Sequence, residues 1–197
     1  MSDIKANDTE SLFRRTGAVL EGHFLLTSGL HSPVYFEKFR ILERPEYTQA
    51  LCGMIAAHFK NAGVDVVAGP TTGGIILAFE VAKQMGLRCI FAEKDESGKR
   101  SFRRGFVLNP GEQVLVVDDN LTTGKSVKEV FAAVAERQAC VVGIGVLVDR
   151  SEHDLKLGYP LFSCLRSVTP AYEPEECPQC KSGAPLVKPG SSHKAAD

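Results

Sequence analysis

The sequence has no charge excess of either sign, no long apolar run and no apolar core at its N-terminus. Its 197 residues carry a formal net charge of −1 at pH 7, which argues against a general grip on nucleic acid. Apolar runs stay short of the ~20 residues that a membrane-spanning helix needs. The polar start MSDIKANDTE lacks the apolar core of a signal peptide. We therefore expect a cytoplasmic protein that binds neither nucleic acid nor membranes.

The six cysteines do not match the framework of a small secreted protein. Four of them lie among apolar residues and are expected to be small buried hydrophobes: Cys52, Cys89, Cys140 and Cys164. Cys177 and Cys180 form half of a zinc knuckle. No second pair or nearby histidine completes it, because His193 lies in a tail whose last eight or so residues we expect to be disordered. We prefer two plain thiols, with a metal site or a redox pair as alternatives.

Strand and helix patterns alternate along the chain, which predicts an α/β domain with a mainly parallel sheet. The apolar content of 44% and the charged content of 24% are ordinary for a globular domain. The expected helices span residues 10–16, 45–62, 74–85 and 126–137, and the expected strands span 23–26, 33–36, 64–69, 88–93, 114–117, 140–148 and 161–168.

The stretch VLVVDDNLTTGKSVKEV, residues 114–130, reads as a buried strand, a loop of small residues and a helix. Ligands of open α/β sheets bind beyond the carboxyl ends of strands, and a helix N-terminus attracts anions. Residues 122–126 therefore form a candidate cup for a monophosphate. A nucleoside-triphosphate loop is the weaker interpretation, because Asp119 occupies the position of its first glycine.

Two carboxylates beside a phosphate would repel it, so Asp118 and Asp119 need another partner. One sugar length away they can accept hydrogen bonds from ribose hydroxyls, which makes this loop a candidate ribose-phosphate site. The plainer alternative is that Asp119 caps the following helix and Asp118 only ends a strand.

Two further segments suit an anionic ligand. GPTTGG, residues 69–74, also follows a strand and opens a helix, and its backbone N–H groups are almost unobstructed. The alternative is a tight turn without a ligand. Residues 94–105 are rich in cations and are expected to be a mobile loop that closes over the site, with a solvated hairpin tip as the alternative.

These motifs resemble those of the type I phosphoribosyltransferases. VLVVDDNLTTGKSV resembles their phosphoribosyl-pyrophosphate motif, and GPTTGG looks like their pyrophosphate loop. GHFLLTSGLHSPVYFEK, residues 22–38, looks like the hood of the orotate branch, and VDR, residues 148–150, looks like its arginine site for orotate. The resemblance implies a hood over residues 1–42, a phosphoribosyltransferase core with helix-flanked sheet over 43–170, and a tail over 171–197.

The resemblance also implies a reaction, transfer of phosphoribosyl from phosphoribosyl pyrophosphate to orotate, giving orotidine monophosphate and pyrophosphate in pyrimidine biosynthesis. Mg²⁺ is expected on the pyrophosphate, near Asp119 and without direct protein ligands. The implied catalytic residues are Lys94, Arg103, Arg104, Asp118 and Asp119. The implied phosphoribosyl-pyrophosphate site comprises Thr71, Thr72, Gly73, Gly74, Lys94, Asp118, Asp119, Asn120, Leu121, Thr122, Thr123, Gly124, Lys125 and Ser126. The implied orotate site comprises Tyr35, Phe36, Thr122 and Arg150.

The chain departs from the family pattern at several positions. Thr27 stands where a lysine is common in the hood, and Thr72 and Gly73 replace a Tyr-Lys pair. The 94–105 loop has no histidine, so the resemblance leaves the general acid unassigned. It further implies a homodimer whose 94–105 loop reaches the partner's site. A phosphoribosyltransferase for a purine base and a non-catalytic nucleotide sensor are the alternative functions.

Overall fold

The computed structural model describes residues 6–26 and 28–189, which form a central sheet flanked by helices and a separate hairpin. Its helices are α1 (Ala6–Arg15), α2 (Phe39–Leu42), α3 (Pro45–Phe59), α4 (Gly73–Met85), α5 (Lys125–Glu136) and α6 (Pro178–Lys181). Its strands are β1 (Val19–Leu25), β2 (His31–Phe36), β3 (Val66–Pro70), β4 (Arg88–Lys94), β5 (Arg100–Phe102), β6 (Gln113–Leu121), β7 (Cys140–Asp149) and β8 (Leu161–Arg166). Thr27 and the end of the tail, including His193, lie outside the described residues.

The six-stranded sheet has the order β5-β4-β3-β6-β7-β8, and only the β4–β5 pair is antiparallel. The predicted α/β class with a mainly parallel sheet is therefore confirmed. After β3, the chain adds β4 and β5 on one side of that strand. It then returns to add β6, β7 and β8 on the other side. Ligands of open parallel sheets bind at such a reversal of strand order, so the carboxyl ends of β3 and β6 are the expected place for a site.

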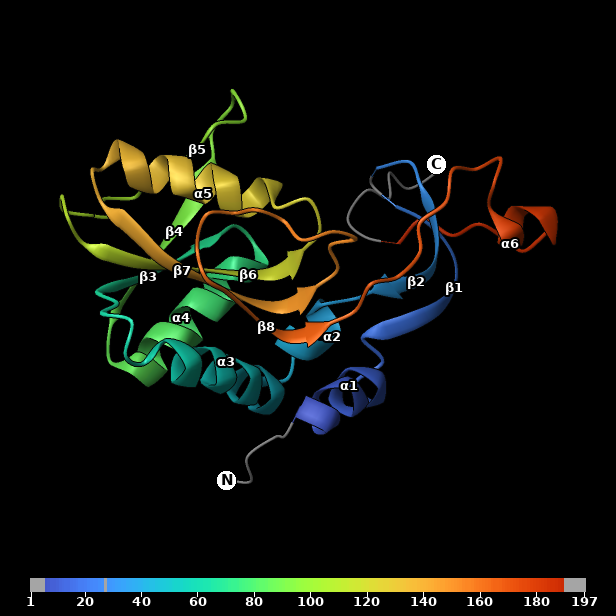
Figure 1. The fold of residues 1–197 in the computed structure, drawn as a ribbon, viewed down its shortest axis with the longest axis horizontal. Helices are drawn as coiled ribbons and strands as arrows, with labels where there is room; N and C mark the ends of the chain where they lie inside the picture. Colours follow the sequence, from blue (N-terminus) through green and yellow to red (C-terminus); the bar gives the residue numbers. More distant parts are fainter. Residues whose placement is uncertain (1–5, 27, 190–197) are drawn as a thin grey trace.

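Helices cover both faces of the sheet, α3 and α4 one face and α5 the other (Figure 1). Each face of the sheet has its own hydrophobic core. The residues of β3 pack alternately into one core and the other, because successive side chains of a strand point to opposite faces. Val67 packs with Leu51, Ile55 and Leu77 below the sheet. The neighbouring Val66 and Ala68 join the core beneath α5. Both faces are covered, which explains why the central strands read as continuous apolar runs.

The two-stranded sheet of β1 and β2 stands apart from the central sheet, and the C-terminal segment runs back beside it (Figure 1). His31 pairs with Tyr172 and Phe24 pairs with Val187 through isolated bridges. Residues about 140 to 160 positions apart in sequence are thereby brought together. No sequence pattern predicted α6 or this return.

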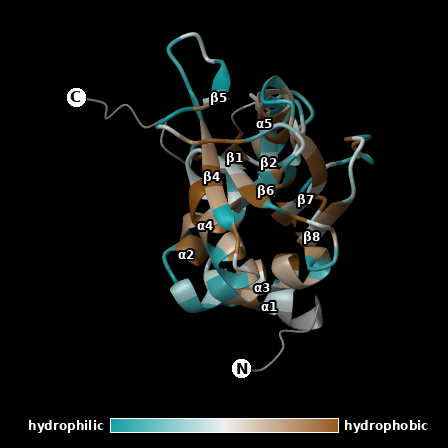
Figure 2. Ribbon diagram, turned by 90° about the vertical axis from the view of Figure 1, so that its left-hand side faces the viewer, coloured by the Kyte–Doolittle hydropathy of each residue, from teal (hydrophilic) through white to brown (hydrophobic). Residues whose placement is uncertain are grey.

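Three expectations about local structure are corrected by the structure. The strand expected over 114–117 runs on to Leu121 as β6. The loop expected over 94–105 contains β5, which makes a hairpin with β4; the hairpin end is hydrophilic, whereas β4 itself is mainly hydrophobic (Figure 2). Cys52 and Cys164 are buried as expected, but Cys89 is only half-buried and Cys140 is exposed. No helix of the described residues is both long and apolar enough to cross a bilayer.

Candidate active site

The acidic pair lies within the last residues of β6 rather than in a loop. Pairing with β7 continues to Leu121 opposite Asp149, and this keeps Asp118 and Asp119 in extended backbone. Each aspartate is only 5% exposed. Since neighbouring residues of a strand point to opposite faces, the two carboxylates meet different partners.

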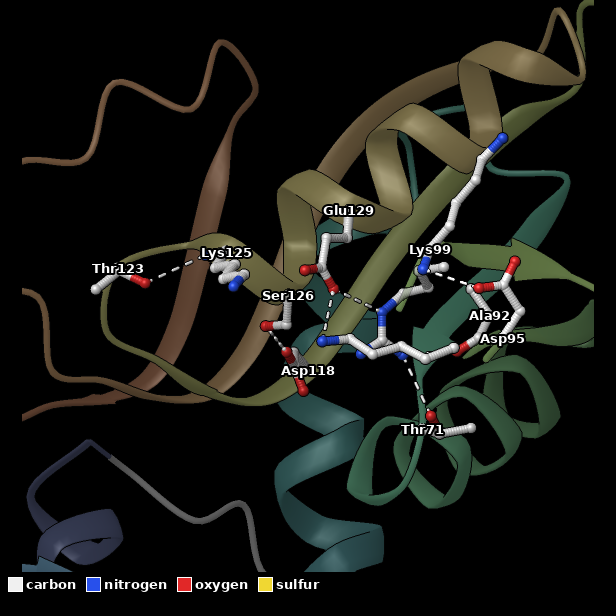
Figure 3. Close-up of polar contacts among 11 residues, drawn as sticks. Thr71, Ala92, Asp95, Lys99, Asp118, Thr123, Lys125, Ser126 and Glu129 are labelled. Carbon is white, nitrogen blue, oxygen red and sulfur yellow. Dashed lines mark hydrogen bonds and ion pairs between the residues drawn. The ribbon is translucent and has the colours of Figure 1, made fainter. Parts of the chain in front are cut away.

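Asp118 points toward α5, where two donors hold its carboxylate. Oδ2 accepts a hydrogen bond of 2.5 Å from Ser126 Oγ, and Oδ1 accepts one of 2.8 Å from the backbone N–H of Asp119 (Figure 3). Burial and the neighbouring charge of Asp119 raise the pKa of Asp118 to about 7, although the Ser126 hydrogen bond opposes the shift. Burial and the neighbouring carboxylate thus both disfavour the charged form of Asp118.

Asp119 points toward the hood and pairs with Lys38, just after β2. Lys38 Nζ lies 3.1 Å from Oδ1 and 2.9 Å from Oδ2. Burial raises the pKa of Asp119, and the charge of Lys38 opposes that shift. The alternative that Asp119 caps the next helix is wrong, because α5 begins after Gly124 and has no side-chain cap. The sequence did not identify Lys38 as a site residue, since a single lysine after a strand has no recognisable spacing.

The loop after β6 forms an open hollow of about 260 Å³ at the N-terminus of α5. Gly124 has φ 74°, a left-handed conformation that favours glycine. The backbone N–H of Lys125 donates to Thr123 Oγ1 over 3.4 Å (Figure 3). The lining residues are Lys94, Arg100, Asn120, Thr122, Thr123, Gly124, Lys125, Ser126 and Glu129. A helix N-terminus with hydroxyls and cations around it suits a phosphate.

Arg100 is a second residue that sequence reasoning missed. Its side chain is buried and donates from Nη1 to Thr71 Oγ1 over 3.2 Å and to the carbonyl of Ala92 over 2.8 Å. Glu129 accepts from its Nε over 3.2 Å. The loop at 69–74 therefore has a cation beside it. The segment 94–105 contains five cationic residues: Lys94, Lys99, Arg100, Arg103 and Arg104. The sequence does not show which of them points toward the 69–74 loop, because this depends on how β5 pairs with β4.

The other cations of the β4–β5 hairpin have partners in the same chain. Lys94 Nζ lies 3.6 Å from Glu129 Oε2 and lines the hollow. Arg104 donates to Glu93 Oε2 over 3.0 Å, and Arg103 lies 3.9 Å from the same carboxylate. Arg103 and Arg104 directly follow β5, and neither lines the hollow.

The loop from Pro70 to Gly73 passes so close to β6 that glycine is required. A Cβ at Gly73 would lie 1.9 Å from Asp119 Oδ2, and one at Gly69 would lie 2.2 Å from the carbonyl oxygen of Gly74. The absent side chain of Gly73 therefore leaves the space in which the Asp119 carboxylate sits. Thr71, Thr72 and Gly74 share this turn, so the 69–74 loop lies directly against the Asp119 end of β6.

Arg150 lies across the site, just after β7. Its backbone N–H donates to the carbonyl of Leu121 over 2.7 Å, which places it beside the loop between β6 and α5. Its guanidinium stacks 5.0 Å from the centre of the Phe36 ring, and Nη2 donates to Thr169 Oγ1 over 3.2 Å. Burial lowers the pKa of Arg150, and burial raises that of nearby Tyr35.

Two buried polar atoms in this region lack a hydrogen-bond partner among the described residues, the donor Arg150 Nε and the acceptor Asn120 Oδ1. A buried polar atom without a partner costs about 1–3 kcal/mol. A planar ligand that carries both an anionic group and a donor can satisfy them. The site therefore brings together most of the residues expected from the sequence, and it adds Lys38 and Arg100.

Comparisons with known proteins agree with this arrangement. The profile of the phosphoribosyl transferase domain matches residues 40–170. The chain is 50% identical to the orotate phosphoribosyltransferase of Pelotomaculum thermopropionicum, over 92% of this chain and 95% of the relative. It is 48% identical to that of Chlorobaculum parvum, over 96% and 97%. The crystal structure of the Aeropyrum pernix orotate phosphoribosyltransferase superposes with a TM-score of 0.70 at 27% identity, covering 79% of this chain and 92% of that one.

Proposed function

The chain belongs to the phosphoribosyl transferase domain family and, within it, to the orotate phosphoribosyltransferases, and from this premise we propose how its own residues perform the reaction. The enzyme transfers phosphoribosyl from phosphoribosyl pyrophosphate to orotate, a reaction of pyrimidine biosynthesis. The purine and non-catalytic alternatives are set aside by this membership. The roles given below to individual residues are proposals.

The contact between Gly73 and Asp119 is the observation that supports the arrangement of the sugar substrate. It places the loop proposed for pyrophosphate against the carboxylate proposed for the ribose hydroxyls. The cup of residues 122–126 lies on the other side of the same carboxylate pair and takes the 5-phosphate. Asn120 and Leu121 form the backbone between the two. One ribose with phosphates at both ends fits this order of groups.

Orotate is proposed to lie between the hood and the cup. Arg150 receives its carboxylate with a guanidinium already held by Phe36 and Thr169. Asn120 Oδ1 is available to accept from a ring N–H. Tyr35 and Thr122 border the same region. Stacking of Arg150 on Phe36 orients the base for attack in line with the leaving group.

Breaking the bond between ribose C1 and pyrophosphate leaves a cationic sugar and an anionic leaving group. No protein nucleophile is required. Asp118 and Asp119 hold the ribose hydroxyls, while Lys94 and Arg100 provide positive charge where the pyrophosphate leaves. Lys38 contacts both carboxylate oxygens of Asp119, so at least one of these contacts must break when the ribose hydroxyls bind. Closure of the β4–β5 hairpin over the site excludes water, which would hydrolyse the activated sugar.

Mg²⁺ is the proposed cofactor, carried on the pyrophosphate. The carboxylates near the hollow are already engaged, because Glu129 pairs with Arg100 and Asp119 pairs with Lys38. These residues fit an ion that keeps water and phosphate oxygens as ligands, with Asp119 as its nearest carboxylate. When bound, the ion neutralises charge that develops on the leaving group.

We further propose a homodimer in the cytoplasm. All six cysteines are free thiols in the structure, which suits a reducing compartment. Arg103 and Arg104 extend from the hairpin with side chains 54% and 65% exposed. A neighbouring subunit can therefore use them, whereas Lys94 and Arg100 already face the hollow of their own chain.

The choice of base is tested directly by pyrophosphate release. Wild-type enzyme with phosphoribosyl pyrophosphate and Mg²⁺ is offered orotate, uracil, adenine or hypoxanthine in turn. Rapid release with orotate alone is expected, because only orotate brings a carboxylate to Arg150. Comparable release with a purine would contradict the proposed base site.

Replacing Arg150 by alanine is expected to raise the KM for orotate much more than the KM for phosphoribosyl pyrophosphate. A buried charge pair that loses one partner costs about 2–5 kcal/mol. Steady-state kinetics with each substrate varied in turn provides the measurement. Arg166→Ala is the matched control, since Arg166 is on the adjacent β8 with its side chain 56% exposed. Equal effects of Arg150→Ala on both substrates would make Arg150 a structural residue.

Replacing Gly73 by alanine is expected to weaken binding of phosphoribosyl pyrophosphate by at least about tenfold, or 1.4 kcal/mol. The added methyl group would overlap Asp119 Oδ2 and force the carboxylate or the loop to move. Calorimetric titration provides the measurement. Gly53→Ala is the control, because its Cβ would meet only the end of the flexible Gln84 side chain. Wild-type affinity in Gly73→Ala would separate the loop from the sugar site.

A further inference from the structure

We propose that His23, His31, Cys177 and Cys180 form a tetrahedral site for a structural zinc ion, which fixes the C-terminal segment to the hood hairpin. Their four ligand atoms all lie within 4.8 Å of one another. His23 comes from β1, His31 begins β2, and the cysteines flank and enter α6. The sequence-based expectation that no histidine completes the Cys-x-x-Cys pair is therefore wrong.

The separations between the ligand atoms are within about 0.3 Å of those in a zinc site. His23 Nε2 lies 3.0 Å from His31 Nδ1, and Cys177 Sγ lies 3.4 Å from His23 Nε2. Cys180 Sγ lies 3.2 Å from His31 Nδ1 and 3.6 Å from His23 Nε2. Tetrahedral zinc with Zn–N near 2.0 Å and Zn–S near 2.3 Å requires ligand-to-ligand separations of about 3.3–3.8 Å. Small adjustments bring the four atoms to that geometry.

The histidine of β1 is oriented by a contact outside the cluster. His23 Nδ1 lies 2.9 Å from the carbonyl oxygen of Ala184, an acceptor, so this nitrogen carries the proton. The proton-free Nε2 then faces the cluster as a ligand. Metal-bound histidines almost always donate their second ring N–H in this way.

Burial and ligand chemistry favour zinc. His23 and His31 are each 4% exposed, and Cys177 is 0% exposed, so the two rings and one thiol have left water. Two thiolates and two neutral imidazoles balance the charge of Zn²⁺. Thiolate with imidazole in a tetrahedral set is typical of zinc. Four protein ligands leave no open coordination position, which indicates a structural rather than a catalytic ion.

The C-terminal segment has little else to hold it. α6 contains no buried residue, and Leu186 and Val187 are 45% and 49% exposed. Its backbone joins the hairpin at two points. Tyr172 exchanges two backbone hydrogen bonds with His31, and Val187 donates to the carbonyl of His23 and accepts from Leu25 N–H. Gln179 Nε2 adds one bond of 2.8 Å to the carbonyl of Gly22. A segment with so small a core commonly depends on a metal.

The first test measures the metal content of untagged full-length enzyme produced with zinc in the medium and kept reduced. We expect about one zinc ion per chain in the wild type. Cys177→Ser, Cys180→Ser and His23→Gln are expected to retain less than about a tenth of it. Cys140→Ser is the matched control and should keep its zinc, because Cys140 is an exposed thiol on β7. Cys180→His should bind zinc, unlike Cys180→Ser, because histidine is itself a zinc ligand.

The second measurement does not depend on the folding of variants. Wild-type enzyme is stripped with a chelator and refilled with Co²⁺, and thiolate-to-cobalt charge-transfer bands with tetrahedral d–d bands are expected. Stripped enzyme should be cleaved by trypsin at Lys181 or Lys188 much faster than zinc-loaded enzyme. A reduced wild type that takes up neither zinc nor cobalt would overturn the proposal, as would zinc that persists in the cysteine variants. A mass showing a Cys177–Cys180 disulfide in protein from reducing cells would also overturn it.

Discussion

An Asp118→Asn variant is expected to bind phosphoribosyl pyrophosphate about 10- to 100-fold more weakly than the wild type, and yet to be more stable at pH 8. The loss of affinity follows from the proposed hydrogen bonds between the ribose hydroxyls and this carboxylate, since bonds to a charged group contribute about 1.5–3 kcal/mol each. Calorimetric titration in the presence of Mg²⁺ provides the measurement.

The gain in stability follows from the raised pKa of Asp118, about 7 in the folded chain. The folded protein keeps the proton of this carboxyl to a higher pH than the unfolded chain does. Stability from this group is therefore fully present below pH 4 and declines as the pH rises through 7. A pKa change of this size corresponds to at most about 4 kcal/mol. Asparagine removes the charge and keeps the shape, so its advantage in stability should grow between about pH 4 and pH 7 and be complete above pH 7.

Chemical denaturation at pH 5 and pH 8 checks this pH dependence. The advantage of Asp118→Asn over the wild type should be larger at pH 8. Asp119→Ala is the informative comparison, because it also weakens sugar binding strongly but leaves Lys38 without its partner. Asp119→Ala should therefore fold, but without the gain in stability at pH 8. Unchanged sugar affinity in both variants would contradict the ribose assignment. An equal advantage of Asp118→Asn over the wild type at the two pH values would contradict the pKa argument.

Two inactive enzymes are expected to regain about a quarter of wild-type activity when their subunits are mixed, if the hairpin serves the partner's site. One enzyme carries Arg103→Ala and Arg104→Ala, and the other carries Asp118→Asn and Asp119→Asn. Each alone should lose about 100-fold or more, because each lacks charges that stabilise the transition state. In a mixed dimer, one site combines an intact acidic pair with an intact hairpin.

Lys94 provides an internal control in this experiment. It lines the phosphate hollow of its own chain beside Arg100. Adding Lys94→Ala to the arginine-deficient subunit should therefore remove the regained activity. Adding it to the aspartate-deficient subunit should have little effect. Native mass spectrometry confirms that the subunits have mixed. Background activity in confirmed mixed dimers would show that each hairpin serves its own subunit, while the other residue assignments would stand.

The sequence by itself determined the class of fold and located the two strand-to-helix loops that we propose as anion sites. Both depend on local patterns, because an apolar strand followed by small residues and an amphipathic helix predicts a phosphate cup wherever it occurs. VLVVDDNLTTGKSV contains such a pattern within 14 adjacent residues. The position of Arg150 after a strand and the glycine-rich turn at 69–74 could be found in the same way.

Only the tertiary structure decided which distant residues share a site. The pairing of β5 with β4 selects Arg100 from several cations, and the hood brings Lys38 to Asp119 across 81 positions. His23 and Cys177 are 154 positions apart, and they meet because the C-terminal segment pairs with β1 and β2. Side chains on separate elements leave no common period or spacing in the sequence. Their contact is set by the packing of the elements, and so the candidate zinc site appears only when the chain is folded.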